Sequence, residues 1–518
     1  MSQINNVVIV GGGTAGWISA ALLAKKLNAS SLGGVSITLV ESPDIPIMGV
    51  GEGTWPTIRK TLQEIGIAED EFIKECDASF KQGAEFVNWC QDPTKVGKHS
   101  YFHPLNATFH AAYDFNLAPY WLLDETKSKQ PYDLASATQS YISSQGLAPK
   151  SITTPQYDAI LNYSYHLNAN KFAKLLTKHA VKLGVHHIQA NIHHVHLDTA
   201  GFVRSVDTDT HGTIEGDFFI DCSGSKAIVL GEALGIKWKS ISDIIFNDTA
   251  LAVQVPYEKA DSPIASNTIA TAQTHGWTWD IGLQNRRGVG YVYSSSHTSE
   301  EHAYSTLVDY LGMPESDLSI RKLPLNLGYR KKFWNKNCVA VGMSAAFIEP
   351  LEASAIFLIE AAVNMIAEKF PRHLSELDYV EKQFNDTFTL RWEKSVDFIK
   401  LHYCISQRRD TQYWIDNAED STIPQTLQQK LQHWRYNVPS KYDFDYAFEP
   451  FVLDSYLFVL YGLKYKTDLQ LKRSFYPQTQ MANKKFSDVV KLNEHLSANL
   501  PTNRDLLEKI LQNGLSKI

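Results

Sequence analysis

The chain has 518 residues, enough for one large domain with insertions or for two to three intertwined domains. Its hydrophobic content of 44% and charged content of 20% are ordinary for a soluble globular protein. The net charge of −7, with Lys and Arg scattered, argues against a nucleic-acid partner, because phosphate binding needs a concentrated basic surface. No apolar run approaches the roughly 20 residues that span a bilayer, so we expect no membrane segment.

The five cysteines are odd in number, widely spaced and never arranged as CxxC. This pattern indicates reduced thiols, and it argues against a disulfide framework and against a metal site. The first apolar run leads directly into glycines and not into a cleavage site, so we expect no signal peptide. Together these features predict a cytoplasmic protein.

The first 41 residues read as a βαβ unit. Val7–Val10 is apolar throughout, as in a buried parallel strand, and a glycine loop, Gly11–Gly16, follows it. Trp17–Leu27 has helical periodicity, and Ser36–Glu41 is a second strand that ends in an acid. Strand, loop, helix, strand and acid in this order predict a dinucleotide-binding unit.

Three glycines occupy the GxGxxG positions of that loop. Gly11 permits a tight turn, Gly13 lets the backbone approach a pyrophosphate, and Gly16 allows close packing of helix on strand. The helix N-terminus would face the phosphate charge, and Glu41 would accept hydrogen bonds from the adenosine ribose. The motif alone also matches a chance glycine turn, but its ordered context favours dinucleotide binding.

The rest of the chain reads as alternating strands and helices that end in a mainly helical region. The sequence predicts a helix over 170–183, a strand over 185–189, several strands over 192–220, antiparallel strands over 251–295, a strand over 337–341, a helix over about 353–370, and mostly helix after 379.

The glycine loop, the strand ending Asp221-Cys222-Ser223-Gly224, and the strand–Gly342–helix unit resemble FAD-binding flavoproteins with two dinucleotide domains. The resemblance implies an α/β, glutathione-reductase-like fold, with a Rossmann-type parallel sheet and an antiparallel substrate-side sheet. We expect a discontinuous FAD-binding module over 1–375, with that second sheet inserted around 251–320. A helical region over 376–518 is expected to complete the substrate pocket.

Several segments also resemble the flavin-dependent tryptophan halogenase family over nearly the whole chain: Gly11–Trp17, Gly49–Thr54, Asp77–Trp89 and Phe347–Ser354. The resemblance implies that FAD is the cofactor and that residues beyond the glycine loop also contact it. The residues expected to bind FAD are Gly11, Gly13, Thr14, Ala15, Gly16, Glu41, Val50, Gly51, Asp221, Gly342 and Leu351.

The resemblance makes Lys81 and Glu352 the expected catalytic residues. By its own pattern Lys81 lies off the apolar face of its segment and reads as a surface lysine. Glu352 precedes a predicted helix, where an acid commonly adds only stability. The functional interpretation is that Lys81 holds hypohalous acid, by hydrogen bonding or as a haloamine, and that Glu352 orients it and accepts the ring proton. Ser354 and Ala355 would bind halide at the helix start, although relatives carry Ser-Thr-Gly there.

A further segment, Trp277–Gly282, resembles the halogenase signature Trp-x-Trp-x-Ile-Pro, with Gly282 in place of the proline. Alternation puts Trp277, Trp279 and Ile281 on one side of a strand, where they either pack as core or wall the flavin from the substrate. His103 is expected to line the substrate pocket.

These resemblances imply a flavin-dependent halogenase, an oxidoreductase that uses FADH2, O2 and chloride or bromide to halogenate a small aromatic substrate. No second dinucleotide fingerprint follows, so we expect a separate flavin reductase to supply FADH2, and a homodimer is left open. An FAD-dependent aromatic monooxygenase and a catalytically silent FAD-binding protein are the alternatives.

Overall fold

The computed structural model describes residues 3–46, 51–105, 111–445 and 447–516. The chain divides into two units that are each discontinuous in sequence. Unit 1 comprises Met1–Ala78, Leu167–Ile241 and Asn326–Trp392, and unit 2 comprises Ser79–His166, Ser242–Leu325 and Glu393–Ile518.

Unit 1 is built on a six-stranded sheet in which β1 is central. The strand order is β20 (Trp334–Asn335), β21 (Cys338–Ala340), β12 (Phe218–Asp221), β1 (Asn6–Val10), β2 (Ser36–Glu41) and β8 (His186–Gln189). All neighbours pair in parallel except β20 with β21. The apolar strands are buried because helices cover the sheet, as expected for a Rossmann-type unit.

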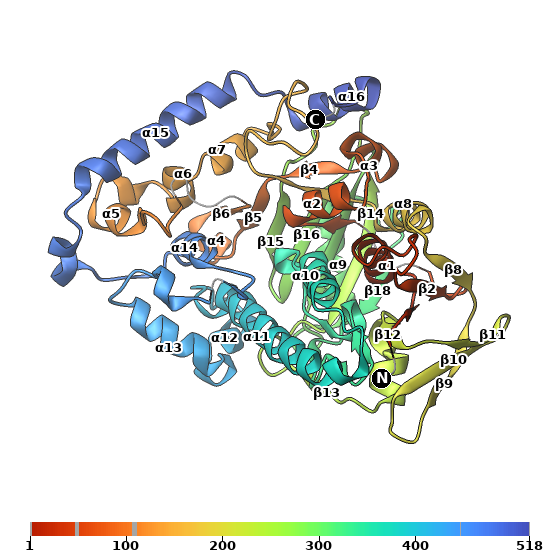
Figure 1. The fold of residues 1–518 in the computed structure, drawn as a ribbon. Helices are drawn as coiled ribbons and strands as arrows, with labels where there is room; N and C mark the ends of the chain where they lie inside the picture. The colour runs from red at the N-terminus through yellow and green to blue at the C-terminus, as the bar shows by residue number, and fades with distance from the viewer. Residues whose placement is uncertain (1–2, 47–50, 106–110, 446, 517–518) are drawn as a thin grey trace. The chain divides into compact units, whose positions relative to one another are not determined.

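Helix α1 (Thr14–Lys26) packs between α8 (Ala169–Lys182) and α10 (Ala355–Glu368), as Figure 1 shows. A separate three-stranded ribbon consists of β9 (Ile192–Leu197), β10 (Val203–Thr208) and β11 (Gly212–Glu215). These bounds confirm the predicted helices and strands to within a few residues, and they confirm the α/β fold.

Unit 2 contains a seven-stranded sheet in the order β18 (Arg321–Pro324), β14 (Thr249–Pro256), β17 (Arg286–Tyr293), β16 (Gly276–Gly282), β15 (Thr268–Ala272), β5 (Gly83–Val87) and β6 (Ser100–Pro104). All pairs are antiparallel except β15 with β5. The sheet was expected only within 251–320, but β5 and β6 extend it with residues from the first quarter of the chain.

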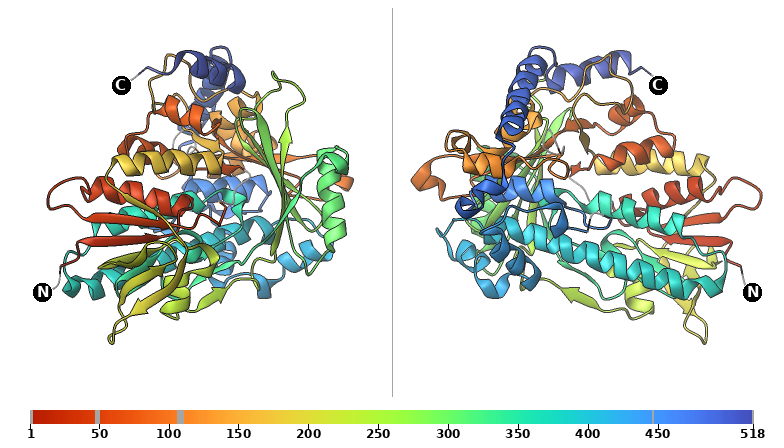
Figure 2. Two further views of the ribbon diagram at one scale, coloured as in Figure 1. Left: turned by 90° about the vertical axis from the view of Figure 1, so that its right-hand side faces the viewer. Right: turned by 60° about the vertical axis from the view of Figure 1, so that its left-hand side comes forward.

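Helix α9 (Glu300–Leu311) covers one face of this sheet, as the left view of Figure 2 shows. Its Ala303 and Leu307 pack on Leu251, Val289 and Tyr291. The opposite face therefore carries the alternate residues of each strand.

The C-terminal region is mainly helical, as predicted. Its α-helices are α11 (Leu377–Cys404), α12 (Gln412–Asn417), α13 (Gln425–Trp434), α14 (Leu453–Gly462), α15 (Thr479–Ser497) and α16 (Asn503–Asn513). Within the described ranges, no helix has both the length and the apolar character needed to cross a membrane.

Candidate active site

The glycine loop between β1 and α1 leaves no room for side chains at two of its positions. Gly11 has φ +111°, and a Cβ there would lie 2.3 Å from the carbonyl oxygen of Cys222. A Cβ on Gly16 would lie 1.9 Å from the carbonyl oxygen of Gly11. By contrast, nothing lies within 4 Å of a Cβ built on Gly13. The loop therefore closes tightly on itself and opens outward at Gly13.

Three segments far apart in the sequence meet beside this loop. In the sheet register, Val10 is level with Asp221, and Asp221 is level with Ala340. Past the end of β21, a Cβ on Gly342 would lie 2.6 Å from the Cβ of Ala15. The carboxyl ends of β1, β12 and β21 and the start of α1 thus form one edge, where parallel sheets bind their ligands.

The start of α1 fits a dinucleotide pyrophosphate. Gly13 is the N-cap residue, no side chain caps the helix, and its first turn, which includes Thr14 and Ala15, holds no acid. Uncapped backbone N–H groups and the positive end of the helix dipole favour a phosphate group.

Glu41 ends β2 next to the loop, where it was expected. A Cβ on Gly12 would lie 2.4 Å from its Cδ, and its Oε2 lies 2.9 Å from Nε2 of His187. The ring of His187 also meets Trp17 edge-on at 4.8 Å between centroids. His187 therefore orients the Glu41 carboxylate, a contact that the sequence did not reveal.

Asp221 differs from Glu41, because its carboxylate is fully buried and bonded to its own chain. Oδ1 accepts hydrogen bonds from the backbone N–H and hydroxyl of Ser223, and Oδ2 accepts from the N–H groups of Val229 and Leu230. Burial raises the pKa of this carboxyl above its ordinary value, and these hydrogen bonds lower it in part. Asp221 holds the loop after β12 in shape.

Two other residues expected to contact the flavin lie outside the long helices and strands. Gly51 has φ +154°, and Leu351 is buried in the short 3-10 turn Pro350–Glu352. Val50 lies outside the described residues.

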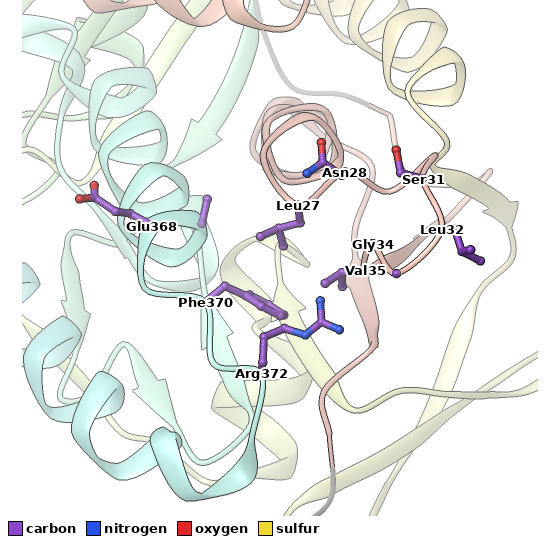
Figure 3. A pocket seen from close by; sticks show the side chains of 11 residues that line it. Leu27, Asn28, Ser31, Leu32, Gly34, Val35, Glu368, Phe370 and Arg372 are labelled. Carbon is purple, nitrogen blue, oxygen red and sulfur yellow. The ribbon is translucent and has the colours of Figure 1, made fainter.

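A cavity of about 610 Å³ lies elsewhere in unit 1 (Figure 3). Asn28, Ser31, Phe370 and Arg372 are among its lining residues. Leu27, one of the residues that line this cavity, directly follows α1. Because α1 has 13 residues and an α-helix rises 1.5 Å per residue, Leu27 lies about 20 Å along the helix from the glycine loop. This cavity is separate from the dinucleotide edge.

Glu352 lies just before α10 and is buried, with 6% of its surface exposed. Ala353, with φ +52°, turns the chain in the left-handed region, and Ser354 is the N-cap of a helix that begins at Ala355. No side chain caps this helix start, and its first turn holds no acid. The backbone N–H groups of Ser354 and Ala355 therefore lie at an uncapped helix start, a position that favours an anion.

Trp55 fixes the position of the segment that carries Glu352. Its indole N–H donates to the carbonyl oxygen of Glu352 at 2.8 Å, and its ring stacks on Phe357 at 4.5 Å between centroids. Trp55 follows directly on the Gly49–Thr54 segment, and only that adjacency could have indicated its role.

One turn further along α10, Glu360 is a buried carboxyl. The hydroxyls of Thr57 and Thr61 donate to it, and burial raises its pKa to about 7. Because the folded chain holds this proton more tightly than the unfolded chain, stability is lost as pH rises from about 4.5 to about 7.

We expect Glu360→Gln to remove this pH dependence, because glutamine does not titrate. Between pH 5 and 8 the free energy of unfolding of the unchanged protein should fall by up to about 3 kcal/mol more than that of the variant. Urea unfolding at each pH measures the difference. Glu368→Gln, at the exposed end of the same helix, is the control, and equal slopes for all three proteins would contradict the prediction.

In unit 2, the strand register aligns the expected substrate-side residues on one face of the seven-stranded sheet. Trp279 is level with Ala270, Ala270 with Phe86, and Phe86 with Tyr101. Since side chains alternate, Trp277, Ile281 and His103 lie on the same face as this row, opposite α9. The ring of Trp279 lies over Gly290, where a Cβ would meet it at 2.1 Å.

The aromatic rings of this face come from both the sheet and the C-terminal helices. His103 has ring centroids of Phe398 and Phe458 at 5.8 and 6.3 Å, and Trp277 contacts Trp89 and Trp279. Trp277, Trp279 and Ile281 are buried, so both sequence interpretations, core packing and a wall, agree with this placement.

Lys81 is the last residue of β4 (Ser79–Lys81) and is only 2% exposed. The surface position indicated by its local pattern is therefore wrong. The next residue, Gln82, accepts a hydrogen bond through its carbonyl oxygen from the N–H of Leu105, directly after β6. Because Lys81 directly precedes Gln82, its backbone lies beside the strand end that carries His103.

Neither unit offers a metal site within its described residues, because no three His, Cys, Asp or Glu side chains cluster suitably there. The five cysteines are all free and buried.

Comparison with known proteins identifies the family. A family model described as tryptophan halogenase matches residues 6–474. The 7-chloro-L-tryptophan 6-halogenase KtzR of Kutzneria sp. (strain 744) is 33% identical over 481 residues, or 88% of this chain and 90% of that protein.

Solved structures agree. A tryptophan halogenase from Shewanella frigidimarina NCIMB 400 has a TM-score of 0.95 and 46% identity over 100% of this chain and 99% of that chain. BrvH, a flavin-dependent halogenase from Brevundimonas sp. BAL3, has a TM-score of 0.86 and 31% identity, covering 98% of this chain and 99% of that one. The chain belongs to the tryptophan halogenase family of flavin-dependent halogenases, enzymes that use FADH2, O2 and halide and require a separate flavin reductase.

Proposed function

We propose that this enzyme halogenates an electron-rich aromatic ring less polar than free tryptophan, an indole, a pyrrole or a phenol, with Lys81 and Glu352 as its catalytic residues. The observation that carries the proposal is the burial of Lys81, whose backbone lies next to the strand end that bears His103. Lysine side chains are rarely buried, and buried ionisable groups are common at functional sites. An aromatic face beside it suits a planar substrate.

FAD is proposed to lie along the edge formed by Gly11–Gly16, Glu41 and Gly342. The chemistry that FADH2 and O2 supply is the oxidation of chloride or bromide to hypohalous acid. The open side of Gly13 and the uncapped start of α1 support a pyrophosphate there, and the carboxylate of Glu41 supports ribose binding. Asp221 would act indirectly, by holding the loop after β12.

In the proposed reaction, the carbon–halogen bond forms as the oxygen–halogen bond of hypohalous acid breaks. Lys81 donates a hydrogen bond to the departing hydroxide, and Glu352 accepts the ring proton. Transfer of that proton from Glu352 to the hydroxide gives the aryl halide and water. Ser354 and Ala355 would hold the halide at the start of α10. Trp277, Trp279 and Ile281 would keep the substrate away from the flavin.

A panel of indoles, pyrroles and phenols, incubated with FAD, a flavin reductase and bromide or chloride, tests the proposal by mass spectrometry. Halogenated products support it. Oxygenated products without halide dependence would instead establish the monooxygenase alternative, and FAD binding without turnover would establish the silent one. The five buried free thiols support a cytoplasmic enzyme.

Glu352→Gln should slow halogenation by about 100-fold without abolishing it. The amide keeps the shape and part of the orientation, but it cannot accept the ring proton. Single-turnover rates of product formation measure the effect. Glu368→Gln, at the exposed end of α10, should keep the original rate, and an unchanged rate for Glu352→Gln would remove Glu352 from the mechanism.

Free tryptophan should be a poor substrate. In the segment Phe448–Tyr456, Asp454 already accepts a hydrogen bond from the N–H of Ala112. Glu449 is buried, its Oε1 accepts a hydrogen bond from the N–H of Asp445, and its Oε2 lies 3.9 Å from Nζ of Lys430. These acids are engaged within the protein, and a buried substrate ammonium needs an anionic partner.

The kcat/KM for 3-methylindole should therefore exceed that for tryptophan by at least about tenfold. Steady-state kinetics on the two substrates, which differ by the amino-acid head group, measure this ratio. Regioselective halogenation of tryptophan with the higher kcat/KM of the two would contradict the expectation.

A further inference from the structure

A polar face is built where β4 pairs with β7 (Ser164–Leu167). Ser79 is level with His166, and Lys81 is level with Ser164. Residues opposite one another in an antiparallel pair point to the same side. The side chains of these four residues therefore share one face, while the rings of Phe80 and Tyr165 pack on the other.

His166 connects this polar face to the aromatic face of the seven-stranded sheet. Its Nε2 lies 2.8 Å from Oγ1 of Thr268, which shares its face of β15 with Ala270 and hence with Trp279. His166 is fully buried, as are Ser79 and Ser164. The imidazole thus lies between the strand of Lys81 and the expected substrate wall.

The second nitrogen of this imidazole has no hydrogen-bond partner among the residues that the structure describes. Nδ1 of His166 is buried and unsatisfied. Leaving such an atom without a hydrogen bond costs about 1–3 kcal/mol. A small molecule bound next to Nδ1 would supply the missing partner.

Chemistry identifies the kind of small molecule. Burial, and then the nearby charge of Lys81, hold the pKa of His166 well below its ordinary value, so the imidazole is neutral at physiological pH. In the tautomer that carries its hydrogen on Nε2 and donates it to Thr268, Nδ1 can only accept. Lys81, as an ammonium, can only donate. A small molecule that binds to both groups must accept a hydrogen bond from Lys81 and donate a hydrogen bond to Nδ1 of His166.

We propose that His166 is a third residue that binds the oxidant, its Nδ1 accepting the hydroxyl hydrogen of hypohalous acid while Lys81 donates to the oxygen. This inference rests on the proposed role of Lys81. Two hydrogen bonds at the oxygen fix the direction of the oxygen–halogen bond, so the halogen faces the ring to be attacked. They also keep a small, diffusible oxidant from escaping.

Two substitutions of His166 separate its nitrogens. His166→Gln sets an amide at the position of Nε2 and loses the acceptor at Nδ1, while His166→Asn sets an amide oxygen at the position of Nδ1 and loses the Thr268 contact. Thr268→Val removes that contact alone. Each variant is assayed for FADH2 consumption, for halogenated 3-methylindole formed per FADH2, and for free hypohalous acid trapped with monochlorodimedone.

His166→Gln should form about tenfold less halogenated indole per FADH2 and release correspondingly more trapped oxidant, with FADH2 consumption unchanged. His166→Asn and Thr268→Val should keep most of the product, a pattern that a purely structural histidine would not give. An unchanged product ratio in His166→Gln, or an equal loss in His166→Gln and His166→Asn, overturns the inference. If the unchanged enzyme halogenates none of the panel substrates, the proposed function itself falls.

Discussion

Lys81→Met should form at least 100-fold less halogenated product than the unchanged enzyme, but it should still consume FADH2 and O2 and release hydrogen peroxide. The reason is that Lys81 acts on hypohalous acid, downstream of the flavin, so its loss leaves the oxidation of FADH2 intact. The substitution suits a residue that is 2% exposed, because methionine is unbranched, of similar length and needs no partner.

Stopped-flow oxidation of FADH2 and mass spectrometry of the product measure the two halves of the reaction separately. Lys95→Ala, which removes a lysine whose side chain is 77% exposed in the same unit, is the matched control and should behave as the unchanged enzyme. Normal halogenation by Lys81→Met would show that the buried amine has no catalytic role.

Local patterns were sufficient to predict the dinucleotide unit. Val7–Val10, the glycine loop and Ser36–Glu41 carry their own hydrophobic periodicity and turn chemistry, and the structure has β1, α1 and β2 there. The same holds for the helix that begins near Glu352. In these segments, the residues whose contacts determine the structure are close to one another in the sequence.

The environment of Lys81 could not be predicted in this way, because its partners are distant in the sequence. Strand β4 has three residues, too few for periodicity to decide a face, and its partner β7 begins only at Ser164. Likewise, β5 joins the second sheet through a parallel pairing with β15. A single sequence contains no signal for such long-range register.

Two acids at the ends of strands show why the residues of the site could be predicted only in part from the sequence. Glu41 and Asp221 gave the same sequence signal, a carboxylate after an apolar strand. The structure leaves Glu41 part-exposed beside His187, whereas Asp221 accepts hydrogen bonds from the loop that follows it. Which acid faces a ligand depends on the path of the next loop, and that path is set by packing.

Gly13→Val should abolish FAD binding without unfolding the protein. No atom lies within 4 Å of a Cβ at this position, and its φ of −73° is allowed for any residue, so valine fits the folded chain. The branched side chain would instead occupy the space that the pyrophosphate needs above the start of α1. Equilibrium dialysis against FAD should show at least a 100-fold weaker Kd, since the phosphate contacts are lost together.

Gly33→Ala is the matched control, because Gly33 also has open space around it but follows α1 at the end opposite the glycine loop. Its φ of +83° makes alanine strained, so this variant should lose about 1 kcal/mol of stability and keep its FAD affinity. Gly13→Val should show the reverse pattern, with an unchanged urea midpoint in the absence of FAD and no added stability when FAD is present. Near-normal FAD affinity in Gly13→Val would mean that the pyrophosphate does not lie at this loop.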